Sequence, residues 1–74
     1  MKLSELQKGD RARIKKIETD EALKTRLFSF GIGRGSELSV ETCSLGKKTI
    51  EILVDGTLVG LRVNEASEIE VEKF

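Results

Sequence analysis

The dipeptide Asp55-Gly56 constrains the fold more than any other feature of this sequence. Both central residues of a type I′ turn need positive φ, and Asp-Gly supplies it, so the dipeptide predicts a two-residue β-hairpin. The apolar residues on either side alternate with a period of two, as in half-buried strands. Such a turn fixes the register of four cross-strand pairs, which are Val54/Thr57, Leu53/Leu58, Ile52/Val59 and Ile50/Leu61.

This register leaves one apolar pair on the outer face of the hairpin. Leu53 and Leu58 lie together on that face, between Glu51 and Gly60. An apolar pair that faces outward is either covered by another element or used as a contact surface. The sequence leaves both interpretations open.

Further strands are predicted on both sides of the hairpin. Alternation indicates strands at residues 11–15, 36–42 and 68–72, in addition to 49–55 and the strand after the turn. Ile14 and Ile17 fall on opposite parity, which predicts a bulge at Lys15-Lys16. Asn64 is expected to cap a single helical turn, and Phe74 is expected to close one end of the core.

A helix is predicted from about residue 20 to residue 30. Thr19-Asp20 offers an N-cap at its start. Leu23, Leu27 and Phe30 follow one another at helical spacing, so this apolar stripe predicts packing into the core. Phe28 lies well off the stripe and is therefore either covered by a loop or exposed for a partner.

These elements predict a mainly β fold, a small and strongly bent antiparallel barrel of about five strands with one short helix after the first strand. Residues 1–74 are expected to form one domain, because no Pro-rich, repetitive or low-complexity segment offers a linker. A chain of this length buries only about 60% of its unfolded surface, so the core must be small.

The composition argues against an enzyme. The sequence has no histidine, which removes the commonest general base and transition-metal ligand. Its lone Cys43 has no histidine to activate it and no partners for a closed zinc site. The glycines at positions 31, 33 and 35 follow a helix and precede a strand, the reverse of a phosphate loop. We therefore expect no catalytic residue, no cofactor and no metal site.

Two features indicate the compartment. A single cysteine cannot form an internal disulfide, which favours a reducing cytosol. The first residues lack the apolar core of a secretion signal, and no segment approaches the ~20 apolar residues of a spanning helix. A cytoplasmic protein with no direct membrane insertion is expected.

The basic run from Arg11 to Lys16 is the strongest nucleic-acid signal, because phosphate contacts need clustered cations. The chain has no Trp or Tyr to stack on bases. If the first and last strands pair, the basic side chains can instead face carboxylates across the sheet. We favour this second interpretation, in which Arg11, Arg13 and Lys15 face Glu68, Glu70 and Glu72, and no stable nucleic-acid complex is expected.

An ordered set of residues runs through nearly the whole chain: Leu3, Leu6, Gly9, Arg26-Leu27, Phe30-Gly31-Ile32, Gly35, Val54-x-Gly56, Gly60-Leu61-Arg62, Ala66 and Ile69-x-Val71. This set resembles the FeoA domain. The resemblance implies an SH3-like β-barrel. It also implies a small cytosolic accessory of bacterial ferrous iron uptake that acts on the membrane transporter FeoB and its GTP-binding part.

From this resemblance we expect a non-enzymatic module that docks on FeoB and reaches the inner membrane only through that partner. The apolar side chains expected to contact the partner are Phe28, Leu45, Leu53 and Leu58. Two alternatives stay open. One is a nucleic-acid-binding barrel that uses the basic first strand. The other is a self-associating module, like the C-terminal domain of metal-dependent repressors, that forms a weak homo-oligomer.

Overall fold

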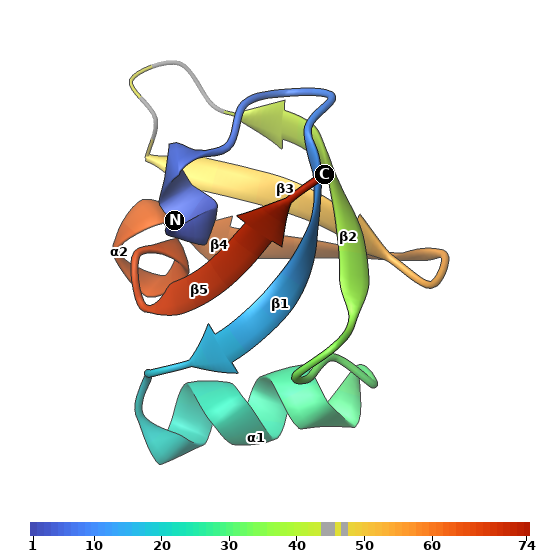
Figure 1. The fold of residues 1–74 in the computed structure, drawn as a ribbon. Coiled ribbons are helices and arrows are strands. Elements are labelled where there is room, and N and C mark those ends of the chain that lie inside the picture. Colours follow the sequence, from blue (N-terminus) through green and yellow to red (C-terminus); the bar gives the residue numbers. More distant parts are fainter. Residues whose placement is uncertain (44–45, 47) are drawn as a thin grey trace.

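The computed structural model describes residues 1–43, 46 and 48–74 of the chain. Its elements are, in chain order, η1 (Leu3–Glu5), β1 (Arg11–Ile17), α1 (Glu21–Ser29), β2 (Glu37–Cys43), β3 (Thr49–Val54), β4 (Thr57–Arg62), α2 (Val63–Ala66) and β5 (Ile69–Lys73) (Figure 1). The strands form one antiparallel sheet in the order β4-β3-β2-β1-β5. The predicted fold class, with its five strands and its helix after the first strand, is confirmed.

The hairpin of β3 and β4 has the predicted turn and register. Asp55 and Gly56 have φ values of 50° and 80°, as a type I′ turn requires. All four predicted cross-strand pairs are present, from Val54 opposite Thr57 to Ile50 opposite Leu61. The inner face of the hairpin is therefore buried, as the alternation of the sequence predicts.

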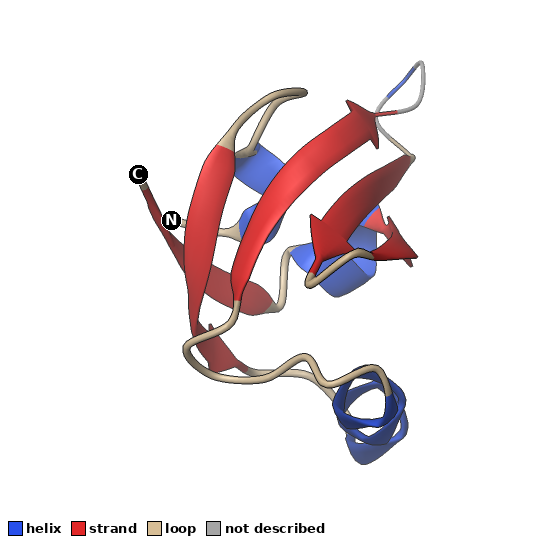
Figure 2. Cartoon of the chain, turned by 90° about the vertical axis from the view of Figure 1, so that its right-hand side faces the viewer, coloured by secondary structure: helices blue, strands red, loops and turns tan. Residues whose placement is uncertain are grey.

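Two bulges bend the sheet. The register of β1 against β5 shifts between Ile14 and Lys16, which confirms the bulge predicted there. A second shift, between Val40 and Thr42, lies in the pairing of β2 with β3. An extra residue in one strand increases the local twist. Consistent with this, the sheet curls strongly around its buried face (Figures 1 and 2).

The core fills the inside of this curl with aliphatic side chains alone. No polar or charged residue is buried in the described part of the chain. Apolar side chains of this kind each contribute about 1.5–3 kcal/mol when fully buried. The largest fully buried side chains are Leu3, Ile14, Leu27, Ile32, Val40, Ile52, Val54 and Ile69.

The two short helices bridge the edge strands of the sheet. η1 contacts β5, α2 contacts β4, and the two helices contact each other. Leu3 of η1 and Ala66 of α2 are completely buried at this junction. Beside it, Lys2 pairs with Glu70 and the Val71 N–H donates to the Met1 carbonyl at 2.8 Å. Helical side chains thus complete the core between β4 and β5.

Helix α1 begins at the predicted cap, because the Asp20 carboxylate accepts a hydrogen bond from the Leu23 N–H at 2.9 Å. Leu23 and Leu27 are buried as predicted, but the prediction that Phe30 packs into the core is wrong, since Phe30 is 46% exposed. The helix ends at Ser29 with Phe30 as its C-cap, and Gly31 turns the chain with a φ of 78°. Ile32 enters the core instead, and its N–H donates to the Leu27 carbonyl.

Two smaller expectations about the C-terminal part are also wrong. Asn64 lies inside α2, whose N-cap position is Arg62. Glu65 does the capping, since its carboxylate accepts the Arg62 N–H at 2.9 Å. Phe74 is 56% exposed, because it has the opposite parity to the buried Ile69 and Val71 and so lies on the outer face of the sheet.

Candidate functional site

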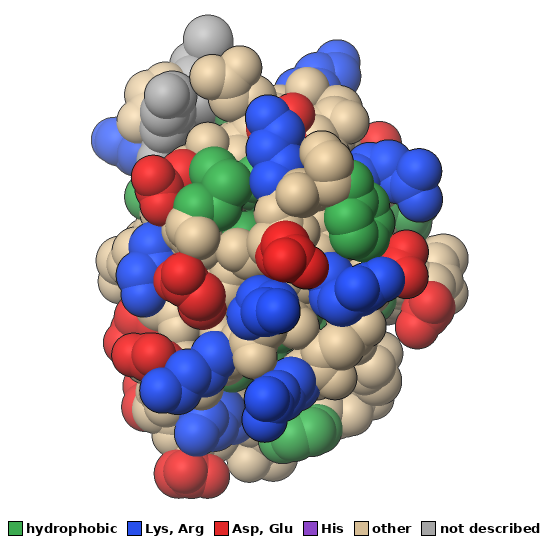
Figure 3. Space-filling view, in the orientation of Figure 1, with side chains coloured by type: hydrophobic (Ala, Val, Ile, Leu, Met, Phe, Trp, Pro, Cys, Tyr) green, Lys and Arg blue, Asp and Glu red, His purple; other side chains and the backbone are tan. Residues whose placement is uncertain are grey.

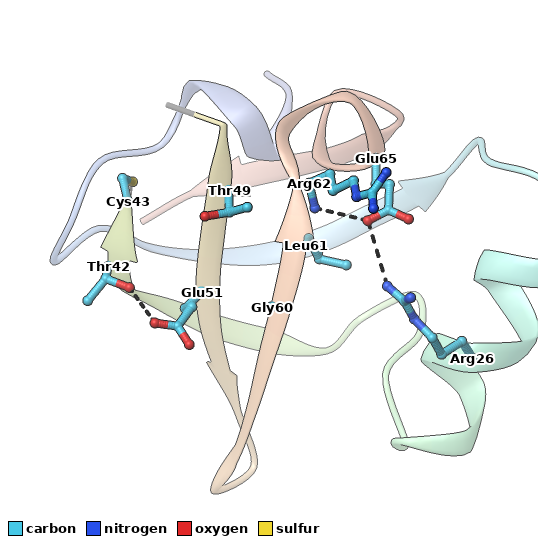
Figure 4. A pocket seen from close by; sticks show the side chains of 9 residues that line it. All are labelled: Arg26, Thr42, Cys43, Thr49, Glu51, Gly60, Leu61, Arg62 and Glu65. Carbon is cyan, nitrogen blue, oxygen red and sulfur yellow. Dashed lines mark hydrogen bonds and ion pairs between the residues drawn. The ribbon is translucent and has the colours of Figure 1, made fainter. Parts of the chain in front are cut away.

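A hollow of about 640 Å³ lies between α1, α2 and strands β2 to β4 (Figure 4). The sequence patterns did not predict this cavity. Its lining comes from five separate elements or their ends, so only the folded chain brings it together. The lining residues are Arg26, Thr42, Cys43, Thr49, Glu51, Gly60, Leu61, Arg62 and Glu65.

Both carboxylates of this cavity already have partners. The Thr42 hydroxyl donates to Glu51 at 2.6 Å (Figure 4). Glu65 accepts the backbone N–H of Arg62, and the Arg26 guanidinium lies 3.7 Å from the same oxygen, which ties α1 to α2. Gly60 lies opposite Glu51 across the hairpin and adds no side chain to the cavity. The charges in the cavity therefore balance, with two guanidinium groups and two carboxylates in its lining.

No group of three or more histidine, cysteine or carboxylate side chains comes together among the described residues. The partly buried Cys43 lies with its Sγ 3.9 Å from the Leu6 carbonyl oxygen. The donor atoms around the cavity therefore form no recognisable ligand set for a metal ion.

Phe28 marks a second hollow, between α1 and the end of β1. Phe28 is 68% exposed, so it lies outside the core, as its position off the helical stripe predicts. The ring lies against the backbone at Gly33, where an added Cβ would come within 3.3 Å of its Cε1 atom. The hollow measures about 190 Å³, and it is lined by Lys16, Ile17, Lys24, Phe28 and Arg34.

The two residues of the outward pair on the hairpin differ in exposure: Leu53 is partly covered, whereas Leu58 is exposed. Leu58, on the edge strand β4, is 55% exposed. Leu53 is half-buried, because it lies between Leu58 and Ser39 of β2 and lines a small hollow of about 140 Å³ that also contains Arg11. This hollow shares no residue with the one at Phe28. The fourth expected contact residue, Leu45, lies outside the described residues.

The basic side chains of β1 mostly lie beside carboxylates. The ion pairs are Arg13–Glu37 (3.3 Å), Lys15–Glu72 (4.0 Å) and Lys16–Glu18 (3.2 Å). Arg11 lies instead over the ring of Phe74, with 5.8 Å between its guanidinium carbon and the ring centre. Cross-strand pairing of the first and last strands is confirmed.

Two of the predicted acidic partners, Glu70 of β5 and Glu68 just before it, contact other groups. Glu70 bonds the N-terminal ammonium at 3.0 Å and lies 3.3 Å from Lys2, and these hydrogen bonds lower the pKa of its carboxyl. Glu68 accepts the Thr19 hydroxyl at 3.1 Å. The register explains the difference, because Arg13 lies opposite Glu72 and the bulge then places Lys16, not Lys15, opposite Glu70.

None of the helices in the described part of the chain has the length or the apolar composition that a membrane-spanning helix needs.

Comparison with known sequences gives one consistent result. The model of the FeoA domain matches residues 1–73. A protein of Campylobacter jejuni that carries the name Fe(2+) transport protein A is 39% identical over 96% of this chain and 96% of its own length. An Fe(2+) transport protein A/FeoB fusion protein of Porphyromonas gingivalis is 32% identical over 97% of this chain, which spans 8% of the fusion.

Solved structures agree with the sequence matches. The FeoA protein of Chlorobium tepidum superposes with a TM-score of 0.93 at 38% identity, over 99% of this chain and 70% of that one. The zinc complex of FeoA from Stenotrophomonas maltophilia, described as a prokaryotic SH3 domain protein, superposes with a TM-score of 0.82 at 26% identity, over 97% and 89%. The chain therefore belongs to the FeoA domain family, with an SH3-like fold and relatives named for ferrous iron transport.

Proposed function

We propose that this chain is a single-domain, non-enzymatic accessory of ferrous iron uptake that binds the cytosolic part of a FeoB-type transporter. One observation carries the proposal. In the Porphyromonas gingivalis relative, a segment matching 97% of this chain is covalently joined to FeoB. Fusion keeps two domains at high effective concentration, which favours contacts that are weak between separate chains. The separate chain then needs a docking surface of its own.

The exposed apolar side chains supply candidates for that surface. Phe28 and Leu58 are both more than half exposed, and Leu53 extends the apolar area beside Leu58. Large apolar side chains of this kind are frequent anchors of interfaces. Leu45 is kept in the proposed contact surface on the strength of the sequence alone.

The charges of β1 support a protein partner over a nucleic acid. Three of its basic side chains lie within 4.0 Å of a carboxylate, so their fields are partly neutralised. Nucleic-acid binding draws most of its free energy from cations that are available to phosphates. The proposal accordingly places the protein in the cytoplasm, at the inner membrane only through its transporter.

Co-purification tests the proposed function directly. The chain, tagged and expressed with the FeoB homologue of its own organism, should elute with that transporter from detergent-solubilised membranes. Leu58→Glu should reduce the recovered transporter about tenfold, because it introduces a charge into an apolar contact. Thr57→Glu is the matched control, since it adds the same charge on the neighbouring exposed residue of β4.

Absence of the transporter from the wild-type eluate would refute the proposed function. Equal recovery with Leu58→Glu and wild type would remove the hairpin from the docking surface but leave the function standing. Both variants should keep the wild-type circular dichroism spectrum, because neither residue lies in the core.

A further inference from the structure

We propose that the hollow at Phe28 is a docking site for an acidic segment of the partner, in which one apolar side chain is flanked by Asp or Glu residues. The inference rests on the proposed function, because it names the chemistry by which the transporter would be recognised. Three properties of the hollow lead to it: its size, its apolar floor and its unbalanced positive charge.

The size of the hollow limits what it can hold. At about 190 Å³ it is smaller than the ~300–1,000 Å³ of ordinary small-molecule pockets. Ile17 and Phe28 give it an apolar floor, and the ring of Phe28 is held against the backbone at Gly33. A hollow with these dimensions and this floor suits a single apolar side chain, as in peptide recognition by a groove.

The positive charge around the hollow favours acidic residues next to that side chain in the partner. The lining contains three cations, Lys16, Lys24 and Arg34, and no carboxylate. Lys16 has an ion pair with Glu18 at 3.2 Å, whereas Lys24 and Arg34 form no ion pair with any described residue. A rim of uncompensated cations attracts an acidic partner and repels a basic one.

Further Lys and Arg side chains lie on the surface near this site, where the side chains of Glu18 and Glu21 are also exposed. Lys and Arg side chains gather over α1 and the adjoining end of β1, beside a patch of hydrophobic surface (Figure 3). Elsewhere on β1 the cations Arg13 and Lys15 already have carboxylate partners. Two cations without an ion pair among the described residues, Lys24 and Arg34, thus lie beside the exposed Phe28.

An anionic lipid surface would also attract these cations, but the helix does not suit it. Helices that lie in a membrane interface present a broad, continuous apolar face. The apolar stripe of α1 packs into the core, because Leu23 and Leu27 are buried, and its only large, exposed apolar side chains are Phe28 in the helix and Phe30 at its C-cap. An aromatic ring beside a small concave site fits a peptide side chain better than a lipid surface.

Binding to the full-length transporter in phosphatidylcholine nanodiscs tests the site. Phe28→Ala should weaken binding about 30-fold, because it removes the anchor that the partner side chain contacts. Lys24→Glu and Arg34→Glu should each weaken it about tenfold and flatten its salt dependence. Lys8→Glu is the matched control, since this exposed residue lies outside the hollow and its reversal changes the net charge equally.

The outcomes separate the site from the function. If wild type binds and all three hollow variants bind equally well, the site is wrong and the proposed function stands. If wild type does not bind the transporter, both are wrong. If wild type binds vesicles of phosphatidylcholine with phosphatidylglycerol as tightly as nanodiscs with transporter, and the same variants abolish this, the occupant is a lipid surface and the inference is overturned.

Photocrosslinking identifies the occupant itself. With p-benzoylphenylalanine at position 28, irradiation in cells should link the chain to a transporter peptide that has an apolar residue among Asp or Glu residues. The same crosslinker at position 8 should not yield that peptide. A crosslinked peptide without acidic residues would contradict the charge argument.

Discussion

Replacing Ile32 by alanine tests the packing of α1 against the sheet. Ile32 is 1% exposed and follows a glycine turn, whereas Phe30, the larger residue predicted for this place, is 46% exposed. Truncation of a buried isoleucine costs about 2–5 kcal/mol, from lost transfer free energy and from the cavity left behind. Truncation of a half-exposed phenylalanine forfeits roughly half of the usual burial term, about 1 kcal/mol.

These losses are large for a chain of this size. At 0.05–0.15 kcal/mol per residue the free energy of unfolding is only about 4–11 kcal/mol. A loss of about 3 kcal/mol in Ile32→Ala lowers Tm by about 12–24 °C, and about 1 kcal/mol in Phe30→Ala lowers it by about 4–8 °C. Thermal unfolding followed by circular dichroism measures both. A Tm that falls as far in Phe30→Ala as in Ile32→Ala would refute this assignment of the core.

Two further predictions concern the turn and an exposed carboxylate. Gly56→Ala should lower the free energy of unfolding by about 1–2 kcal/mol, because residue 56 has a φ of 80°. Gly60→Ala should be neutral or slightly stabilising, because an added Cβ there meets nothing within 4 Å. Chemical denaturation measures both variants, and equal losses of stability would contradict the turn assignment. The Gln7 N–H and Lys73 lower the pKa of Asp10, so its charge stabilises the fold above the ordinary aspartate pKa, and this contribution is lost as the pH falls through the lowered value. The stability difference between wild type and Asp10→Asn should therefore shrink below about pH 4, and a difference that does not change with pH would refute it.

Local patterns were sufficient to predict the strands and the register of the β3–β4 hairpin. Asp55-Gly56 determines the turn, and the parity change between Ile14 and Ile17 indicates the bulge, because each is a property of a few neighbouring residues. The outward position of Phe74 follows from the same parity rule, because Phe74 lies an odd number of residues after the buried Val71.

Other features depend on how separate segments meet. Phe30 fits the helical stripe, yet the turn at Gly31 gives its place in the core to Ile32, and the periodicity of the helix holds no information about the chain beyond its end. The sequence singled out Phe28 but did not place cations beside it, because Lys16 and Arg34 come from separate parts of the chain. Leu53 and Leu58 were predicted as a pair, but their exposure differs because β2 pairs with β3 and partly covers Leu53, while no strand covers the outer edge of β4 among the described residues.

The two edges of the sheet differ in how they are covered, which matters for engineering the N-terminus. On β5 the outer edge is covered where Lys2 pairs with Glu70 and the Val71 N–H bonds the Met1 carbonyl. On β4 no further strand pairs with the outer edge among the described residues. Uncovered edges are templates for pairing between molecules. Deleting the first two residues would leave a sheet open on both sides, which can add neighbours in either direction and grow into a chain of molecules.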